Sequence, residues 1–479
     1  MRIDLPRPVL QAGTYALGLA ISKGVSLLMV PVLTRYLSPE GYGALEILTA
    51  LADIGSVLLG AGLAETMIRF AGSATSTAER DRVAAEVFGM ALVTAVLFLI
   101  ATQLAAPAIT AALPEGVTVA QVRFLLLSLT VTACIEVPLF WLRMNEEALT
   151  FVAFSAGKNV IQAGLMVLAL QQGWGVTGLI AVGTVCECGL ALLAGWWVGR
   201  RTGIVFVTER LPRLLLYGGP LVVGGIANFV SGSLDRWILA DAVGLANMAK
   251  YALAAKFALV TFLLIQPFQL WWFARQFTVL TGPDGHTRAG RTIGYGAACM
   301  ILAAAVMSVA GPLAILWLTP PAYHGAAVYV PWLAALVALQ EIGNFMSLGC
   351  HYRRTGFLPM TINLVAAGVA LTLYMLLIPR YGIEGAIAAR LAVQLVRITL
   401  FVSLGHRTAP IPYPFVRLAG LAAAAVLLFA WLGPATGSAG WVLLGLGGLL
   451  GLGAMAVAIG LVWVPRGFRL LPSTNAAGA

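Results

Sequence analysis

Long apolar stretches make up most of the chain, and short polar or charged segments separate them. Each stretch has about 20 residues or more, the length that an α-helix needs to cross the hydrocarbon core of a bilayer. Bounded by charge, proline or glycine, the stretches predict an all-α polytopic membrane protein with about 14 transmembrane helices. The crossings are expected at residues 9–33, 43–63, 84–106, 121–142, 149–172, 177–199, 214–234, 248–270, 292–318, 327–349, 358–378, 383–403, 414–433 and 441–464.

The composition agrees with lipid as the main solvent. Of the 479 residues, 60% are hydrophobic and 10% are charged, whereas a soluble domain carries about 25% charged residues. The longest predicted loops are residues 271–291 and 64–83. Neither has room for a soluble catalytic or nucleotide-binding domain, so we expect a function located among the helices and no enzyme.

The basic residues indicate an orientation in the membrane. With a cytoplasmic N-terminus, 19 of the 29 Lys and Arg fall on the cytoplasmic side, five on the other side and five inside crossings. The positive-inside rule then places both termini in the cytoplasm. Although the net charge is +10, basic residues never form a run longer than two. We therefore expect no nucleic acid as a partner.

The first crossing and the five cysteines carry weaker signals. The first apolar run has about 25 residues and contains Lys23, whereas the apolar core of a signal peptide has 7–15, so we expect this run to remain a crossing. The cysteines lie in or beside apolar stretches, where Cys behaves as a small hydrophobic residue. We expect no disulfide, no metal site and no cofactor.

An internal repeat divides the chain into two lobes. The segment GVTGLIA at 175–181 recurs as GIEGAIA at 382–388, and LTRYL at 33–37 is similar to LDRWI at 234–238. Because each block holds six crossings, both lobes enter the membrane in the same direction, related by an axis along the membrane normal. The predicted parts are residues 1–213, 214–405 and, for the last two helices and tail, 406–479.

Several motifs resemble the polysaccharide-biosynthesis (Wzx-type) flippases of lipid-linked oligosaccharides, which share a superfamily with multidrug exporters and lipid II flippases. The resemblance runs from residue 10 to about 400. It is carried by LTRYLSPEGYGALEIL at 33–48, GLAETMIRF at 62–70, LDRWIL at 234–239, YALAAKF at 251–257 and IPRYGIEGAIAARLAVQ at 378–394.

That resemblance implies a fold, a location and a set of partners. The fold would be MATE-like, with two six-helix lobes in a V-shaped arrangement. The protein would flip a polyprenyl-pyrophosphate-linked glycan across the bacterial inner membrane by alternating access, in contact with membrane lipids. A polysaccharide polymerase and other assembly proteins are further expected partners.

Lys23 is the first candidate ligand for the pyrophosphate. It lies ten and 14 residues from the two ends of its predicted crossing, or about 15 and 21 Å at 1.5 Å per residue. A charge at that depth costs at least about 2.5–3.5 kcal/mol, so it needs a reason. The reason could be a phosphate ligand in a cavity, a structural pair with an acid, or a misplaced helix.

Arg390, Gln394 and Arg397 form a second candidate site. Their i, i+4, i+7 spacing puts them on one helix face, and two guanidinium groups suit a pyrophosphate because each can donate two parallel hydrogen bonds. The alternative for Arg397 is that it reaches the headgroups at the membrane surface.

Other ionisable groups inside crossings complete the candidates. Lys158 and Lys256 are further pyrophosphate ligands. Asp53, Glu136 and Glu187 could titrate and couple flipping to protons or sodium; static pairing with Lys23, Lys158 or Lys256 is the alternative. Polar residues on one face, such as Gln340, Asn344 and Ser347, must face protein or water, and hydrogen bonding between helices also explains them.

The sequence therefore predicts an oligosaccharide-lipid flippase. One alternative is a multidrug-type exporter of small organic ions. The other is a membrane-embedded polysaccharide polymerase or glycosyltransferase, which would need acids on a large extracytoplasmic loop that the chain does not supply.

Overall fold

The structure is a computed structural model. It describes residues 7–59, 76–206, 211–352, 357–433, 435 and 437–461. The GLAETMIRF motif at 62–70 lies outside the described residues.

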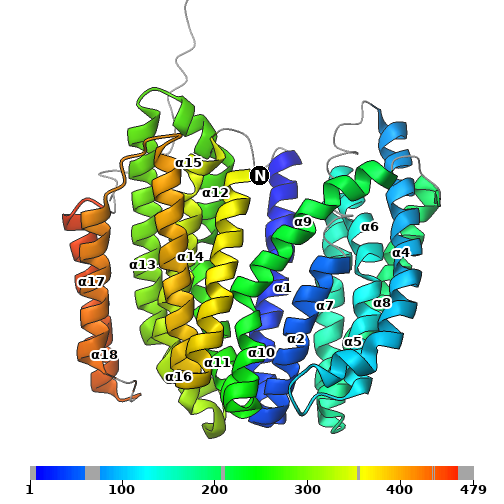
Figure 1. The fold of residues 1–479 in the computed structure, drawn as a ribbon, viewed down its shortest axis with the longest axis horizontal. Coiled ribbons are helices and arrows are strands. Elements are labelled where there is room, and N and C mark those ends of the chain that lie inside the picture. The colour runs from blue at the N-terminus through cyan, green and yellow to red at the C-terminus, as the bar shows by residue number, and fades with distance from the viewer. Residues whose placement is uncertain are drawn as a thin grey trace, which may run out of the picture. The chain divides into compact units, whose positions relative to one another are not determined.

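Figure 1 shows that the described part of the chain is built of helices. The first lobe predicted from the sequence contains α1 (Arg7–Tyr36), α2 (Pro39–Leu59), α4 (Thr77–Ala111), α5 (Val119–Thr130), α6 (Thr132–Met144), α7 (Ala148–Gln171) and α8 (Gly175–Thr202). The remainder contains α9 (Leu211–Gly232), α10 (Leu234–Val243), α11 (Leu245–Ala258), α12 (Val260–Thr281), α13 (Gly285–Leu318), the 3-10 helix η1 (Pro321–Tyr329), α14 (Val330–Met346), α15 (Leu348–His351), α16 (Phe357–His406), α17 (Phe415–Leu432) and α18 (Ala439–Ala458).

Twelve of the described helical segments are long and apolar enough to cross a membrane. One of them, α16, has 50 residues, about 75 Å at 1.5 Å per residue, which is more than twice the thickness of the hydrocarbon core. Its backbone is non-helical at Gly382, so it supplies two crossings. The pair α9 and α10 lies where the sequence predicts one more crossing. The protein is thus a multi-pass membrane protein, as predicted, and these spans are consistent with fourteen crossings.

The two copies of the repeat share an unusual backbone conformation. Gly175 has a φ of 55° and Gly382 a φ of 58°, in the left-handed region where a Cβ is strained. Each of these glycines stands at a reversal of the chain between two antiparallel helices, α7 and α8 or the two halves of α16. The repeat therefore preserves a glycine that makes a tight turn possible.

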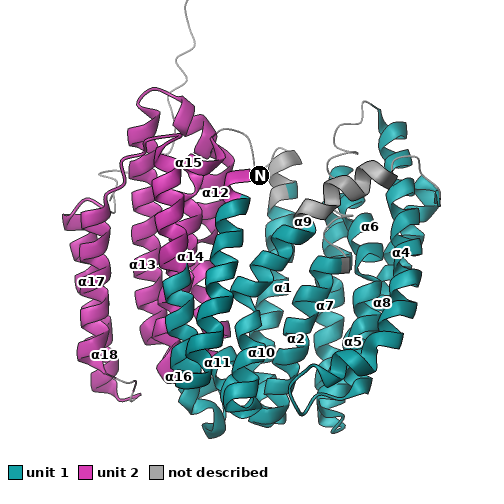
Figure 2. Ribbon diagram, in the orientation of Figure 1, with its two compact units in different colours: residues 1–253, 315–326, 360–393 teal, residues 254–314, 327–359, 394–479 magenta. Residues whose placement is uncertain are grey.

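The helices group into two compact units, shown in Figure 2. Unit 1 comprises residues 1–253, 315–326 and 360–393, and unit 2 comprises residues 254–314, 327–359 and 394–479. These units reflect packing in the present structure. The predicted division of the chain at residues 213 and 405 stays a prediction.

Unit 1 has its main apolar cores among the helices of the first repeat. One core, around Phe88, Trp141 and Val198, joins α4, α6 and α8. Another, around Leu48 and Leu126, joins α2, α4 and α5. The side chain of Ser76 caps α4 by accepting a hydrogen bond from the backbone N–H of Glu79. Such a cap satisfies one of the four N–H groups that a helix start leaves open.

In unit 2, α17 and α18 are held against the other helices at both ends. Trp441 of α18 is buried against Val309 and Leu313 of α13. Before the start of α17, the Tyr413 hydroxyl donates a hydrogen bond of 3.2 Å to the carbonyl of Met346, the last residue of α14. Burial raises the pKa of this hydroxyl, which lies in the segment before α17.

Two helix boundaries differ from the sequence prediction. The expected loop at 271–291 is three residues long, because α12 continues to Thr281 and α13 begins at Gly285. The crossing expected to end at residue 234 continues through α10 to Val243. An apolar run ends where charge begins, whereas a helix continues wherever its charges are exposed or paired. Arg275 and Arg288 are exposed, and Asp235 and Arg236 of α10 form buried ion pairs.

Candidate functional site

Arg390 is bound to an acid inside unit 1. Its Nη1 atom lies 3.4 Å from Asp235 Oδ2 and donates a hydrogen bond of 3.0 Å to the hydroxyl of Tyr251. The Tyr251 hydroxyl in turn donates to the same Asp235 oxygen. The Asp235 side chain is 0% exposed and that of Arg390 is 12% exposed. We call Arg390, Asp235 and Tyr251, together with Arg236 and Glu46, the paired cluster. It joins α2, α10, α11 and α16.

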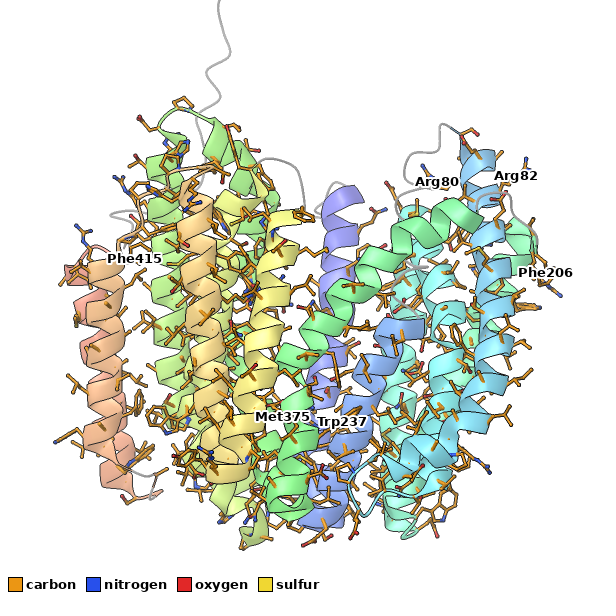
Figure 3. All side chains as sticks on the ribbon, in the orientation of Figure 1. Arg80, Arg82, Phe206, Trp237, Met375 and Phe415 are labelled. Atoms are coloured by element: carbon orange, nitrogen blue, oxygen red, sulfur yellow. The ribbon has the colours of Figure 1, made fainter. Side chains whose placement is uncertain are left out.

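The neighbour of Asp235 points to a different helix. Arg236 Nη1 lies 3.4 Å from Oε2 of Glu46 on α2, whose side chain is 0% exposed. The next residue, Trp237, packs against the apolar core that contains Leu48 and is labelled in Figure 3. Successive residues of a helix diverge by about 100°, so the LDRWIL motif connects α10 both to α16 and to α2.

Two further candidate acids have polar partners in unit 1. Lys158 of α7 forms an ion pair with Glu187 of α8, and both side chains are largely buried. Asp53 on α2 accepts a hydrogen bond of 2.9 Å from the Ser233 hydroxyl. The structure thus brings Lys158 together with Glu187, the static pairing that the sequence left open.

Lys23 has different surroundings. It lies near the middle of α1, is exposed, and makes no ion pair or hydrogen bond with any residue that the structure describes. Helix α1 packs on α7 through Tyr15, which contacts Phe151, and Gly18, against which Val152 lies. Lys23 follows Gly18 by five residues, about 140° around the helix, so it faces away from α7.

Arg397 belongs to a chain of polar side chains in unit 2, which we call the amide-linked cluster. Its guanidinium donates hydrogen bonds to Asn344 Oδ1 at 2.9 Å and to Gln394 Oε1 at 3.5 Å. The Asn344 amide donates to Glu341 Oε2 at 3.1 Å, and the Gln269 amide donates to the same oxygen at 2.6 Å. Glu341, Gln269 and Gln394 are buried. The cluster joins α12, α14 and α16.

Lys256 and Glu136 are the two remaining candidates. Lys256 is a half-buried residue on α11, and Glu136 is a half-buried residue on α6. Both interact with other groups. The structure therefore leaves their predicted roles as predictions.

An apolar cavity of about 840 Å³ lies within unit 2. It is bounded by α13, α14, the end of α16, and α17, with Phe415 at the start of α17 (Figure 3). Ser308 is the hydroxyl-bearing residue in its lining, and this hydroxyl donates to the backbone of its own helix. The cavity therefore offers an apolar surface for an apolar ligand.

Glu341, Asp235 and Glu46 were not selected as candidates from the sequence. Asn344, whose polar neighbours suggested a stripe on one helix face, lies three residues after Glu341. The signal that could have identified Glu341 is its position between two amides on a crossing, since a buried carboxylate needs donors. Its partner Gln269 lies 72 residues away in the sequence, and no spacing rule connects the two.

Comparisons with known proteins identify the family. Residues 32–269, about half of the chain, match the model of a family described as polysaccharide biosynthesis protein. The chain belongs to this family. The succinoglycan biosynthesis transport protein ExoT of Rhizobium meliloti (strain 1021) is 24% identical over 242 residues, which are 49% of this chain and 46% of that protein. The aligned part thus spans about half the length of that relative.

Solved structures show the fold of this family member. A structure of the lipid II flippase MurJ in an inward closed conformation superposes with a TM-score of 0.73 at 10% identity, covering 93% of this chain and 99% of that one. An inward-facing multidrug resistance MATE family transporter of the MOP superfamily gives a TM-score of 0.56 at 16% identity, covering 85% and 98%. The predicted MATE-like fold and the family resemblance are confirmed.

Proposed function

We propose that this protein flips a polyprenyl-pyrophosphate-linked glycan across the bacterial inner membrane by alternating access. Membership in a polysaccharide biosynthesis family and similarity to a succinoglycan transport protein favour a glycan cargo. The fold shared with a lipid II flippase favours a lipid-linked form of it. Polysaccharide polymerase and other assembly proteins stay predicted partners.

The observation that carries the proposal is the environment of Lys23. An ammonium exposed halfway along a crossing would be costly in lipid, so its face of α1 borders a water-filled or ligand-filled space. No described residue neutralises it. In a low-dielectric surrounding such a charge attracts phosphate far more strongly than in water. It also opposes binding of organic cations, which disfavours a multidrug-type exporter of cations.

Arg397 is the second proposed contact for the pyrophosphate. Its guanidinium donates hydrogen bonds to the amide oxygens of Asn344 and Gln394, which orient it. Arg390 and Lys158 each contact a carboxylate directly. We therefore assign Arg390 to the fold, and we expect Lys158 to contribute little net charge to cargo binding.

The apolar cavity of unit 2 is a proposed site for part of the polyprenyl tail. Its volume, about 840 Å³, is in the range of sites for drug-sized molecules, about 300–1,000 Å³. It can therefore accept only a portion of a long isoprenoid chain, and the rest of the tail would remain in the bilayer.

Flipping of a fluorescent polyprenyl-pyrophosphate sugar in proteoliposomes tests the proposal. We expect Lys23→Glu to abolish flipping, because it reverses the charge that attracts the cargo, and Lys23→Arg to retain most of it. Both variants should show the thermal stability of the parental protein, since Lys23 has no described partner to lose. Parental flipping by Lys23→Glu would contradict the assignment, and gain of cationic-dye export would favour the exporter alternative.

The cytoplasmic position of both termini stays a prediction that cysteine labelling can test. Single cysteines at Ser76 and Thr287 should label from the cytoplasmic side only, and a cysteine at Gln172 from the outside only. Thr287 is preferred to Gly285, because a Cβ at Gly285 would lie 2.0 Å from the carbonyl oxygen of Leu280. Outside labelling of Ser76 in intact cells would invert the topology.

A further inference from the structure

Glu341 is a buried carboxylate for which the proposed function has no role so far. It lies on α14 with 7% of its surface exposed, within a segment apolar enough to cross the membrane. Both hydrogen bonds that the structure describes for it are to the Oε2 atom, one from Gln269 and one from Asn344. Two amide donors stabilise an ionised carboxylate only in part, because the desolvation of a buried charge is large.

The remaining stabilisation comes from Arg397. Its guanidinium attracts the Glu341 carboxylate, and Asn344 bridges the two groups. The amide oxygen of Asn344 accepts from Arg397 at 2.9 Å while its nitrogen donates to Glu341 at 3.1 Å. The orientation of Asn344 is therefore set by Arg397, and in that orientation the amide presents a donor to the acid.

The groups that face Glu341 favour a proton over a metal ion as its ligand. From α12 it faces the neutral amide of Gln269, and from α16 the guanidinium of Arg397. Between residues 292 and 318, α13 carries no Asp, Glu, Lys, Arg or His. At the end of α15, His351 is bound to the Ser347 carbonyl. A metal cation would need several oxygen ligands and would be repelled by Arg397, whereas a proton needs neither further ligand nor space.

We infer that Glu341 binds a proton when anionic cargo engages Arg397, with Asn344 as the connecting residue. This inference rests on the proposed function, which places the pyrophosphate at Arg397. When the guanidinium turns toward the pyrophosphate, Asn344 loses the donor that orients it and Glu341 loses its counter-charge. The carboxylate then takes a proton from water, forming one O–H bond and leaving hydroxide to the buffer. Release of the cargo reverses the step.

Linkage gives the direction of the pH effect. If cargo binding takes up one proton, the affinity for cargo rises by up to about tenfold for each unit that the pH falls. By the same reciprocity, an acidic compartment favours the loaded state and a more alkaline one favours release.

Isothermal titration of the purified full chain with geranylgeranyl pyrophosphate tests the inference. Titrations at pH 7.5 in HEPES and in Tris, which differ in ionisation enthalpy, give the number of protons bound per ligand. The parental protein should take up about one proton more than Glu341→Gln, whose amide retains hydrogen bonding but cannot ionise. Asn344→Ala should also lose this extra proton. Asp241→Asn, which changes an exposed acid on α10, should match the parental protein.

The possible failures are distinguishable. If the probe binds the parental protein and Glu341→Gln with equal proton uptake, Glu341 is not the coupled site, although the anion site stands. If Asn344→Ala folds and keeps the extra proton, the bridge is wrong. If the probe does not bind the parental protein, the proposed anion site and the inference that rests on it both fail.

Discussion

Arg390 and Arg397 lie on the same helix seven residues apart, yet their surroundings differ. In the paired cluster, Arg390 contacts the carboxylate of Asp235 directly, and that carboxylate is fully buried. In the amide-linked cluster, Arg397 reaches the acid Glu341 through Asn344. A direct contact fixes the guanidinium as part of the fold, whereas an amide bridge holds it in position and lets a stronger acceptor compete for it. A shared helix face is therefore not evidence of a shared role.

Removal of Asp235 should have the largest effect. Asp235→Ala leaves the Arg390 guanidinium in a buried site without its carboxylate and the Tyr251 hydroxyl without its acceptor. Breaking one side of a buried ion pair costs about 3–5 kcal/mol. We expect loss of most folded protein, measured as monodisperse yield and as the thermal unfolding midpoint in detergent.

A double variant separates charge from shape in the paired cluster. Asp235→Leu with Arg390→Met removes both charges and should recover much of the stability that Asp235→Ala loses, because a buried ion pair can often be replaced by apolar residues. Asp241→Asn is the control for changing an acid on the same helix at an exposed position. An unchanged unfolding midpoint for Asp235→Ala would mean that the pair is not part of the fold.

Transport should distinguish the two arginines. Arg397→Ala should lower flipping by about 10- to 100-fold and cost less stability than Asp235→Ala, since a hydrogen bond to a charged group contributes about 1.5–3 kcal/mol and each 1.4 kcal/mol is tenfold. Arg397→Lys keeps the charge but loses the planar guanidinium. Its flipping rate should therefore lie between those of the parental protein and Arg397→Ala. The measurement is flipping in proteoliposomes with matched amounts of protein.

Arg390→Ala should behave in the opposite way, with loss of folded protein and, for the fraction that folds, a smaller loss of flipping. The comparison would be reversed by an Arg390→Ala protein that is fully stable but inactive. Such a result would move the anion site to the paired cluster.

Weakening the ion pair between Arg236 and Glu46 should lower the stability less than the changes at Asp235 or Arg390. Glu46→Gln keeps an oxygen that can accept from Arg236, and Arg236 remains attracted to Asp235. We expect a loss of about 1–3 kcal/mol, the cost of a weakened hydrogen bond to a charged group. Thermal unfolding measures it, with Arg236→Met plus Glu46→Met as the partner variant. A loss as large as that of Asp235→Ala would mean that α10 is anchored to α2 as strongly as to α16.

The sequence predicted the crossings and, through the repeat, the turn that precedes the last crossing of each lobe. It did not predict which charged residues pair across helices. Gly175 and Gly382 recur in the repeat because each turn needs a positive φ, which is a local requirement. The end of the seventh crossing was placed too early, because an exposed and a buried Arg236 look the same in a hydropathy profile. The pairing of Lys158 with Glu187 was one of two open alternatives, and only packing of α7 on α8 selects it.

The sequence by itself determined the solvent, the approximate number of crossings, the family and the residues that could carry charge inside the membrane. It could do so because burial in lipid is a property of single residues and short runs. Which of those charges are neutralised was decided only by the tertiary structure. Asp235 meets Arg390 across 155 residues of chain, and Glu341 meets Gln269 across 72. Electrostatic energy depends on distance and dielectric surroundings, and neither quantity is encoded in the spacing of residues along one helix.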